Sequence, residues 1–191
     1  MYVGTEFRPY CALQRWALVV ALSRFGTFSH LGQLVSSSSD DVFPGLQSWS
    51  FHGSSYSSSY LTFDPAEISS SIPNATGNGH QPLDTLSPLQ SQVFQAYDRP
   101  PRSPAAGAIP FVDLGNQFVF TGASTSPSVL EHLALDQIGA DLSDPSSPVA
   151  QVVDGTANYL VAALCQVTGA PVAACSSPVT SRALAQMSGN G

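Results

Sequence analysis

The N-terminal 25 residues constrain the fold most strongly, because a short strand runs directly into a long apolar helix. Residues 2–7 have the apolar character of a buried strand. From Cys11 to Phe25, apolar side chains recur at three- and four-residue steps and also occupy the other faces, which predicts a mostly buried helix. Pro9 suits the first helical turn, where a missing N–H is tolerated. The junction between the two elements is Phe7-Arg8-Pro9-Tyr10-Cys11.

This junction resembles a Cys-x-x-Cys redox motif in which Arg8 replaces the first cysteine. Thioredoxin-like oxidoreductases carry Cys-x-x-Cys where a strand turns into a helix, and Cys-Pro-Tyr-Cys is typical of glutaredoxins. In such motifs the helix dipole and free N–H groups stabilise the first thiolate. That thiolate attacks a substrate disulfide, and the second thiol resolves the mixed disulfide. With Arg8 at the first position, we expect dithiol exchange to be lost.

Two interpretations of Cys11 stay open. A guanidinium at Arg8 would favour the Cys11 thiolate, and the first helical turn would do the same, so Cys11 could be a lone nucleophile that forms persistent mixed disulfides. Alternatively, Cys11 is a buried structural thiol and Arg8 is a solvated cation. The nearby Glu6 could relay protons to Cys11 or pair with Arg8 or Arg15.

Composition and charge limit the classes of partner. The chain has 191 residues, enough for one domain with a sizeable core, and 43% of them are apolar. Its six basic residues are all arginine, and the net charge of −7 argues against nucleic acid or an anionic membrane as partners. We expect no metal and no cofactor, since no phosphate-binding or nucleotide-binding motif occurs and the histidines lack metal-ligand spacing: His30, His52, His80 and His132.

The cysteines and the chain start bear on the cellular compartment. Cys165 and Cys175 flank Gly169-Ala170-Pro171, a plausible turn, and we expect them to form a disulfide, which would indicate an oxidising compartment. The alternative is two buried free thiols. No apolar run reaches transmembrane length. Because the sequence enters its first strand almost at once, we expect a membrane anchor or signal to lie upstream in a longer protein.

The rest of the chain predicts a mixture of strands, helices and polar loops. Strands are expected at residues 47–51 and 61–63, and a hairpin at 108–120 that turns at Gly115-Asn116. Helices are expected at 89–97, 126–138 (with Ser126 as N-cap) and 149–167. Irregular segments are expected as a hairpin loop at 53–60, a flexible loop at 69–86 and a frayed tail at 176–191.

Several motifs carry a resemblance that covers most of the chain. They are Val3-Gly4-Thr5-Glu6 and Arg15-Trp16-Ala17 around the junction, Ala21-Leu22-Ser23-Arg24-Phe25-Gly26, Gly53-Ser54-Ser55-Tyr56-Ser57-Ser58, Ile109-Pro110-Phe111-Val112-Asp113, Ser126-Pro127-Ser128-Val129-Leu130 and Gly155-Thr156-Ala157-Asn158-Tyr159. Residues 2 to about 165 resemble the thioredoxin-like family known as domain of unknown function 929. In that family, the position of Arg8 holds the first, exposed cysteine.

The resemblance implies one α/β domain over residues 1–191, with a thioredoxin-like central mixed sheet flanked by helices and an additional C-terminal helix. It implies an extracytoplasmic, membrane-anchored thiol–disulfide oxidoreductase. A cis Ile109-Pro110 bond would face the motif and leave the Ile109 backbone free to bind an extended peptide. The expected catalytic positions are Glu6, Arg8, Pro9, Tyr10, Cys11 and Pro110, and the expected binding positions are Tyr10, Ile109 and Pro110.

Three functions are compatible with these residues. The first is an oxidoreductase-like domain disabled at Arg8, whose partners would be protein thiols or disulfides. The second is a non-catalytic module that binds an extended peptide or a protein at Ile109 and Pro110. The third is a monothiol adduct-former that uses Cys11.

Overall fold

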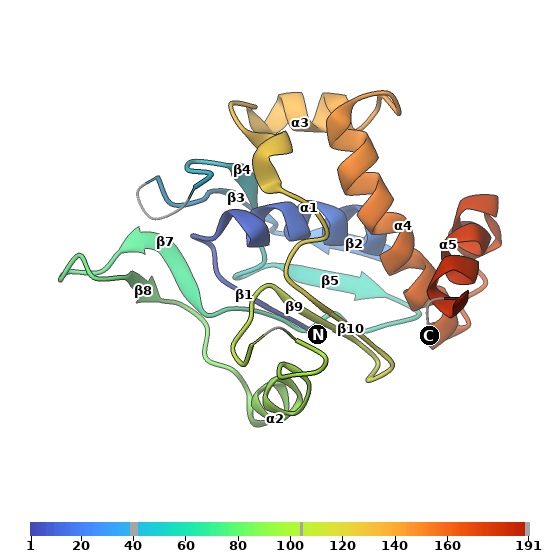
Figure 1. Ribbon diagram of the computed structural model, residues 1–191, viewed down its shortest axis with the longest axis horizontal. Coiled ribbons are helices and arrows are strands. Elements are labelled where there is room, and N and C mark those ends of the chain that lie inside the picture. The colour runs from blue at the N-terminus through green and yellow to red at the C-terminus, as the bar shows by residue number, and fades with distance from the viewer. Residues whose placement is uncertain (39–41, 104, 190–191) are drawn as a thin grey trace.

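The computed structural model describes residues 1–38, 42–103 and 105–189 and has a mixed α/β fold, as predicted (Figure 1). Its main sheet has the strand order β10-β9-β1-β6. Strand β1 pairs parallel with β6 and antiparallel with β9, which in turn pairs antiparallel with β10. The four strands are β1 (Tyr2–Gly4), β6 (Pro65–Glu67), β9 (Phe111–Leu114) and β10 (Phe118–Thr121).

Helices cover both faces of this sheet (Figure 1). Helix α1 (Pro9–Leu22) packs along α4 (Pro148–Thr168) on one face, and α2 (Pro88–Tyr97) lies on the other, where Phe94 contacts Phe111 at a ring distance of 5.1 Å. The main core fills the space between the sheet, α1 and α4. A second core joins α1 to the 3₁₀ turn Pro127–Leu130 and to α3 (Leu135–Asp141). Every helix in the described parts of the chain is too short or too polar to span a bilayer.

Several sequence predictions are confirmed. Helix α1 is mostly buried and begins at Pro9, although it ends at Leu22 rather than Phe25. Helices α2 and α4 and the β9–β10 hairpin occur where they were expected. The hairpin turns at Gly115 and Asn116, which both have positive φ. The Ile109-Pro110 bond is cis.

The polar segment at 53–60 was predicted to be a loop, and this is wrong. Residues Ser55–Ser58 form β5, which pairs with β2 (Gly26–Ser29). The Tyr56 hydroxyl donates to the Leu22 carbonyl at 2.9 Å, and the Ser58 hydroxyl donates to the Phe25 carbonyl at 2.7 Å. These long-range bonds hold a sequence of low complexity in an extended conformation. Conversely, residues 61–63 form no strand, and β6 begins only at Pro65.

Two further strand pairs lie outside the main sheet. The first joins β3 (Gly32–Val35) to β4 (Gln47–Ser50), which confirms the strand predicted at 47–51. The second joins β7 (Ser69–Pro73) to β8 (His80–Pro82), so the segment 69–86, predicted as a flexible loop, contains a hairpin. At the end of this hairpin the Asn74 side-chain oxygen accepts hydrogen bonds from the N–H groups of Thr76 and Asn78, which closes the turn.

The single helix predicted at 126–138 is also wrong. The Ser126 hydroxyl does accept the Ser128 N–H, but only the 3₁₀ turn follows it, and His132 has a φ of +63° before α3 begins. Leu130 and Ile138 are both fully buried in the second core. The break between the two elements lets both side chains reach that core.

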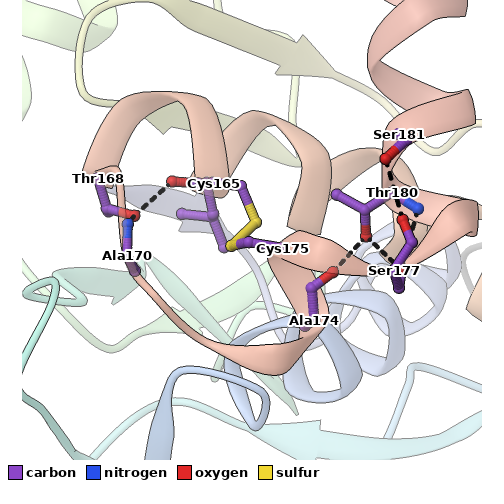
Figure 2. Close-up of a disulfide and its surroundings, with 9 residues drawn as sticks. Cys165, Thr168, Ala170, Ala174, Cys175, Ser177, Thr180 and Ser181 are labelled. Atoms are coloured by element: carbon purple, nitrogen blue, oxygen red, sulfur yellow. Dashed lines mark hydrogen bonds between the residues drawn. A yellow bond between two sulfur atoms is a disulfide. The ribbon is translucent and has the colours of Figure 1, made fainter.

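The C-terminal tail is helical rather than frayed up to residue 189, and residues 190 and 191 lie outside the described part. Helix α5 (Pro178–Gly189) packs against α4 and buries Thr180 and Ala183. The predicted disulfide joins Cys165, near the end of α4, to Cys175, with 5.5 Å between their Cα atoms (Figure 2). The Ser177 hydroxyl then accepts the Thr180 N–H at 3.1 Å and caps α5.

Candidate functional site

The motif lies where β1 gives way to α1. Arg8 is the last extended residue before the helix, with φ −80° and ψ 132°, and it provides no side-chain cap. Its side chain is exposed, and its guanidinium lies over the Phe7 ring, 5.6 Å from the ring centre. The Phe7 ring stacks in turn on the His80 ring of β8 at 3.9 Å. Arg8 is therefore an exposed cation at the residue directly before α1.

Tyr10 and Cys11 differ sharply in exposure. The Tyr10 side chain is 42% exposed, and its ring lies 6.3 Å from the Phe43 ring. Cys11 is a free thiol with no exposed surface. Burial is the main cause that raises the Cys11 pKa, with a smaller opposing effect from the Arg15 guanidinium. The thiol is thus held protonated, and the cation that acts on it is Arg15 rather than Arg8.

Arg15 and Glu67 form a buried ion pair in the same region as Cys11. Both side chains are fully buried, and the Arg15 Nη1 lies 3.2 Å from each Glu67 carboxylate oxygen. The same nitrogen donates to the Thr5 carbonyl at 3.0 Å, and Nε donates to the Ser48 hydroxyl at 3.3 Å. The pair links α1 to β6 across the end of β1, because Glu67 is the register partner of Gly4.

Burial dominates the titration of Glu67, whereas charge dominates that of Arg15. Burial raises the pKa of Glu67 from 4.5 to about 7, although the Arg15 charge acts in the opposite direction. The Glu67 charge raises the pKa of Arg15 above its ordinary value against desolvation, so Arg15 stays charged. The Tyr2 hydroxyl completes the cluster, 3.5 Å from the Arg15 Nη1 and in hydrogen-bond contact with Cys11. Burial raises the Tyr2 pKa well above its usual range.

The expected pairing of Glu6 with an arginine is wrong. The Glu6 carboxylate accepts the Ser50 hydroxyl at 2.6 Å and the Ser71 N–H at 3.2 Å. Only its backbone carbonyl contacts Arg15, at 3.3 Å from Nη2. Glu6 therefore fastens β4 and β7 to the motif segment.

Pro110 lies at the same end of the sheet as the motif. Phe111 pairs with Val3 in the antiparallel ladder, so Pro110 comes opposite Gly4, four residues before Arg8. The Pro110 carbonyl accepts the Gly122 N–H at 2.8 Å. Within the described residues, no hydrogen bond uses the backbone of Ile109.

Sequence reasoning missed Glu67. Its only signal is an acidic residue between Ala66 and Ile68, in a stretch that was not predicted as a strand. No three His, Cys, Asp or Glu side chains gather as a metal site in the described ranges.

Comparison with known proteins identifies the family. The model of the family described as domain of unknown function (DUF929) matches residues 1–166. The chain belongs to this family. No curated protein and no solved structure matches the chain. The DUF929 match includes the motif, Glu67, Pro110 and Cys165, whereas Cys175 and α5 lie beyond it.

Proposed function

We propose that this chain is a thioredoxin-like, thiol–disulfide oxidoreductase-type domain whose dithiol exchange is disabled at Arg8. The observation that carries the proposal is the contrast between two motif positions. The exposed position before α1 holds a guanidinium, and the one thiol of the motif, Cys11, is fully buried with a raised pKa. A buried, protonated thiol is a poor nucleophile.

The chain order around the motif supports the thioredoxin-like part of the proposal. Strand β1, helix α1 and the parallel strand β6 come first, followed by α2, the antiparallel pair β9 and β10, and α4. The motif lies at the β1–α1 junction, and Pro110 precedes β9 at the same end of the sheet. This arrangement supports a groove for a substrate disulfide.

The buried cluster supports the redox part. A resolving thiol must lose its proton before it attacks a mixed disulfide. Cys11 lies beside Arg15, which stabilises a thiolate, and near Glu67, whose raised pKa of about 7 suits it to accept a proton near neutral pH. The surroundings of a resolving cysteine are thus present without the attacking thiol.

Restoring the thiol tests this proposal. In an insulin-reduction assay with dithiothreitol, Arg8→Cys should exceed Arg8→Ser by roughly tenfold or more, and Arg8→Cys with Cys11→Ser should lose that gain in turnover. The matched serine variant separates the effect of the new thiol from that of removing the guanidinium. Equal activity of Arg8→Cys and Arg8→Ser in folded proteins would refute the proposal of a disabled oxidoreductase.

A second candidate is a binding module that holds extended peptides at Ile109 and Pro110. The unused Ile109 backbone and the exposed Tyr10 ring favour it. Tyr10→Ala, which removes the exposed ring, should weaken binding of an unfolded, thiol-free polypeptide, while Arg8→Ser leaves it unchanged. Binding that Tyr10→Ala leaves unchanged in a folded protein would contradict this binding module. The monothiol function is disfavoured because Cys11 is buried and protonated.

The disulfide supports an extracytoplasmic location, because such bonds persist in oxidising compartments. We propose that the domain lies on the outer side of a membrane. Alkylation of intact cells with an impermeant thiol reagent after reduction would modify Cys165 and Cys175 if this is correct, and would leave them unmodified if the domain lies inside.

A further inference from the structure

We infer that the outer edge of β10 is a docking site for an extended segment of another protein in which an apolar side chain stands next to an acidic one. This site is separate from the motif and from the Ile109–Pro110 groove.

The backbone of β10 is open along one side. The Gly122 N–H donates to the Pro110 carbonyl across the β9–β10 ladder. In an antiparallel pair, residues alternate between those whose backbone groups face the partner strand and those whose backbone groups face away. The N–H and C=O groups of Phe118 and Phe120 therefore face β9, and those of Val119 and Thr121 face outward. Strand β10 ends the sheet order, and no described residue bonds to those outward groups. The strand sequence Phe-Val-Phe-Thr contains neither a charge nor a proline that would block pairing.

The opposite edge of the sheet, strand β6, is covered against pairing with another strand, whereas the edge at β10 is not. Strand β6 begins with Pro65, and Asp84 covers its end. The Asp84 carboxylate accepts the Glu67 N–H at 2.9 Å, and the Asp84 N–H donates to the Glu67 carbonyl at 2.8 Å. The fold thus blocks one edge and leaves the more apolar edge available.

A cavity flanks β10 on the α4 side. It has a volume of about 320 Å³ and is lined by Phe120, Val152 and Tyr159 together with uncharged polar residues. Gly155 also lines it, in the middle of α4, where glycine weakens a helix by about 1 kcal/mol relative to alanine. A Cβ at Gly155 would meet no atom within 4 Å, so packing against the protein does not require the glycine. Its missing side chain widens a cavity suited to an apolar group.

A second cavity flanks β10 on the α2 side. It has a volume of about 410 Å³ and is lined by Val119, Gln117, Asn116, Tyr97 and Arg102. Arg102 provides the one charge of this lining, and its guanidinium is positioned over the Tyr97 ring, 5.4 Å from the ring centre. A carboxylate is the complementary ligand for this cation.

The two cavities lie on opposite faces of β10. Phe120 lines the first, and its neighbour Val119 lines the second. A segment added alongside β10 would direct successive side chains to opposite faces. One side chain would enter the apolar cavity as its neighbour reached Arg102. Charge disfavours a second copy of β10 as the occupant, because each copy would bring Arg102 and no carboxylate from these linings.

The test uses the full chain and a capped, fluorescein-labelled peptide of about eight residues in which leucine and glutamate alternate, with a leucine–lysine peptide as the matched control. Fluorescence anisotropy gives the affinity, and ¹⁵N-resolved amide shifts locate the contact. The leucine–glutamate peptide should bind and shift the amides of Val119 and Thr121. Arg102→Glu should weaken it by about tenfold or more and allow the lysine peptide to bind. Gly155→Leu, which fills the apolar cavity, should weaken binding to a similar degree.

Arg102 is exposed and Gly155 faces open space, so both variants should fold, and unchanged unfolding midpoints check this. Three results would overturn the inference: no binding of the leucine–glutamate peptide at millimolar concentration, binding that Arg102→Glu leaves unchanged, or shifts confined to the motif. Concentration-dependent dimerisation that shifts Val119 and Thr121 would assign the edge to a second copy and would also overturn it.

Discussion

Replacing Glu67 with glutamine tests which of two opposing effects governs the buried pair. Desolvation disfavours the carboxylate, whereas the Arg15 guanidinium, 3.2 Å from both carboxylate oxygens, favours it. The Glu67 pKa, raised from 4.5 to about 7, indicates that desolvation dominates. Glutamine has nearly the same shape as the uncharged acid and cannot ionise, so it isolates the charge.

The sign and size of the effect follow from linkage. An acid whose pKa is higher in the folded state than in the unfolded state contributes its full stability below the unfolded pKa, here 4.5, and loses it as the pH rises through the folded pKa of about 7. At about 1.4 kcal/mol per pH unit between these two pKa values, the complete loss is roughly 3 kcal/mol. Glu67→Gln should therefore match the wild type near pH 4 and exceed its unfolding free energy by roughly 3 kcal/mol near pH 8.

Urea unfolding of both proteins at the two pH values measures this difference. Other titrating groups are common to both proteins and largely cancel. A Glu67→Gln variant that becomes less stable relative to the wild type as the pH rises would refute the reasoning, because the Arg15 charge would then outweigh desolvation.

Three further predictions concern the disulfide, β1 and the free thiol. Replacing both Cys165 and Cys175 with serine should lower the unfolding free energy by about 3 kcal/mol in urea, because the bond closes a loop of separation 10. Gly4→Ala should lower the urea-unfolding free energy by roughly 1–3 kcal/mol, because its Cβ would overlap the Tyr2 hydroxyl. Cys11 should resist alkylation in the folded protein between about pH 6 and pH 8, since burial keeps it inaccessible and protonated; mass spectrometry detects the adduct.

Each of these predictions has a control. The single variant Cys11→Ser does not open the disulfide loop, and a loss of stability confined to Cys11→Ser would contradict the disulfide prediction. Gly139→Ala, whose Cβ meets no atom within 4 Å, should be neutral or stabilising, and equal losses at Gly4 and Gly139 would show that steric overlap is not the cause. Rapid native alkylation of Cys11 would revive the monothiol function.

The candidate site was predictable from sequence only in its outer part. Arg8 and Tyr10 were expected at the motif because the strand–helix junction and the helix start have local signals, whereas Pro110 was expected to face the motif only through the family resemblance. The inner part was not predictable. Glu67 is 52 residues from Arg15 in sequence, and no local pattern indicates that the two side chains meet. Glu6 was assigned an arginine partner for the same reason, but its partners come from β4 and β7.

Local signals in the sequence specify several elements. The apolar periodicity of α1, the Gly115-Asn116 turn and the spacing of Cys165 and Cys175 each specify a structure over a few residues. Which polar segments become ordered depends instead on the tertiary structure, as β5 and α5 show, because their hydrogen bonds and buried contacts come from distant residues. The tertiary structure also decides the state of Cys11, because the pKa of a thiol depends on the burial and the charges that the fold assembles around it.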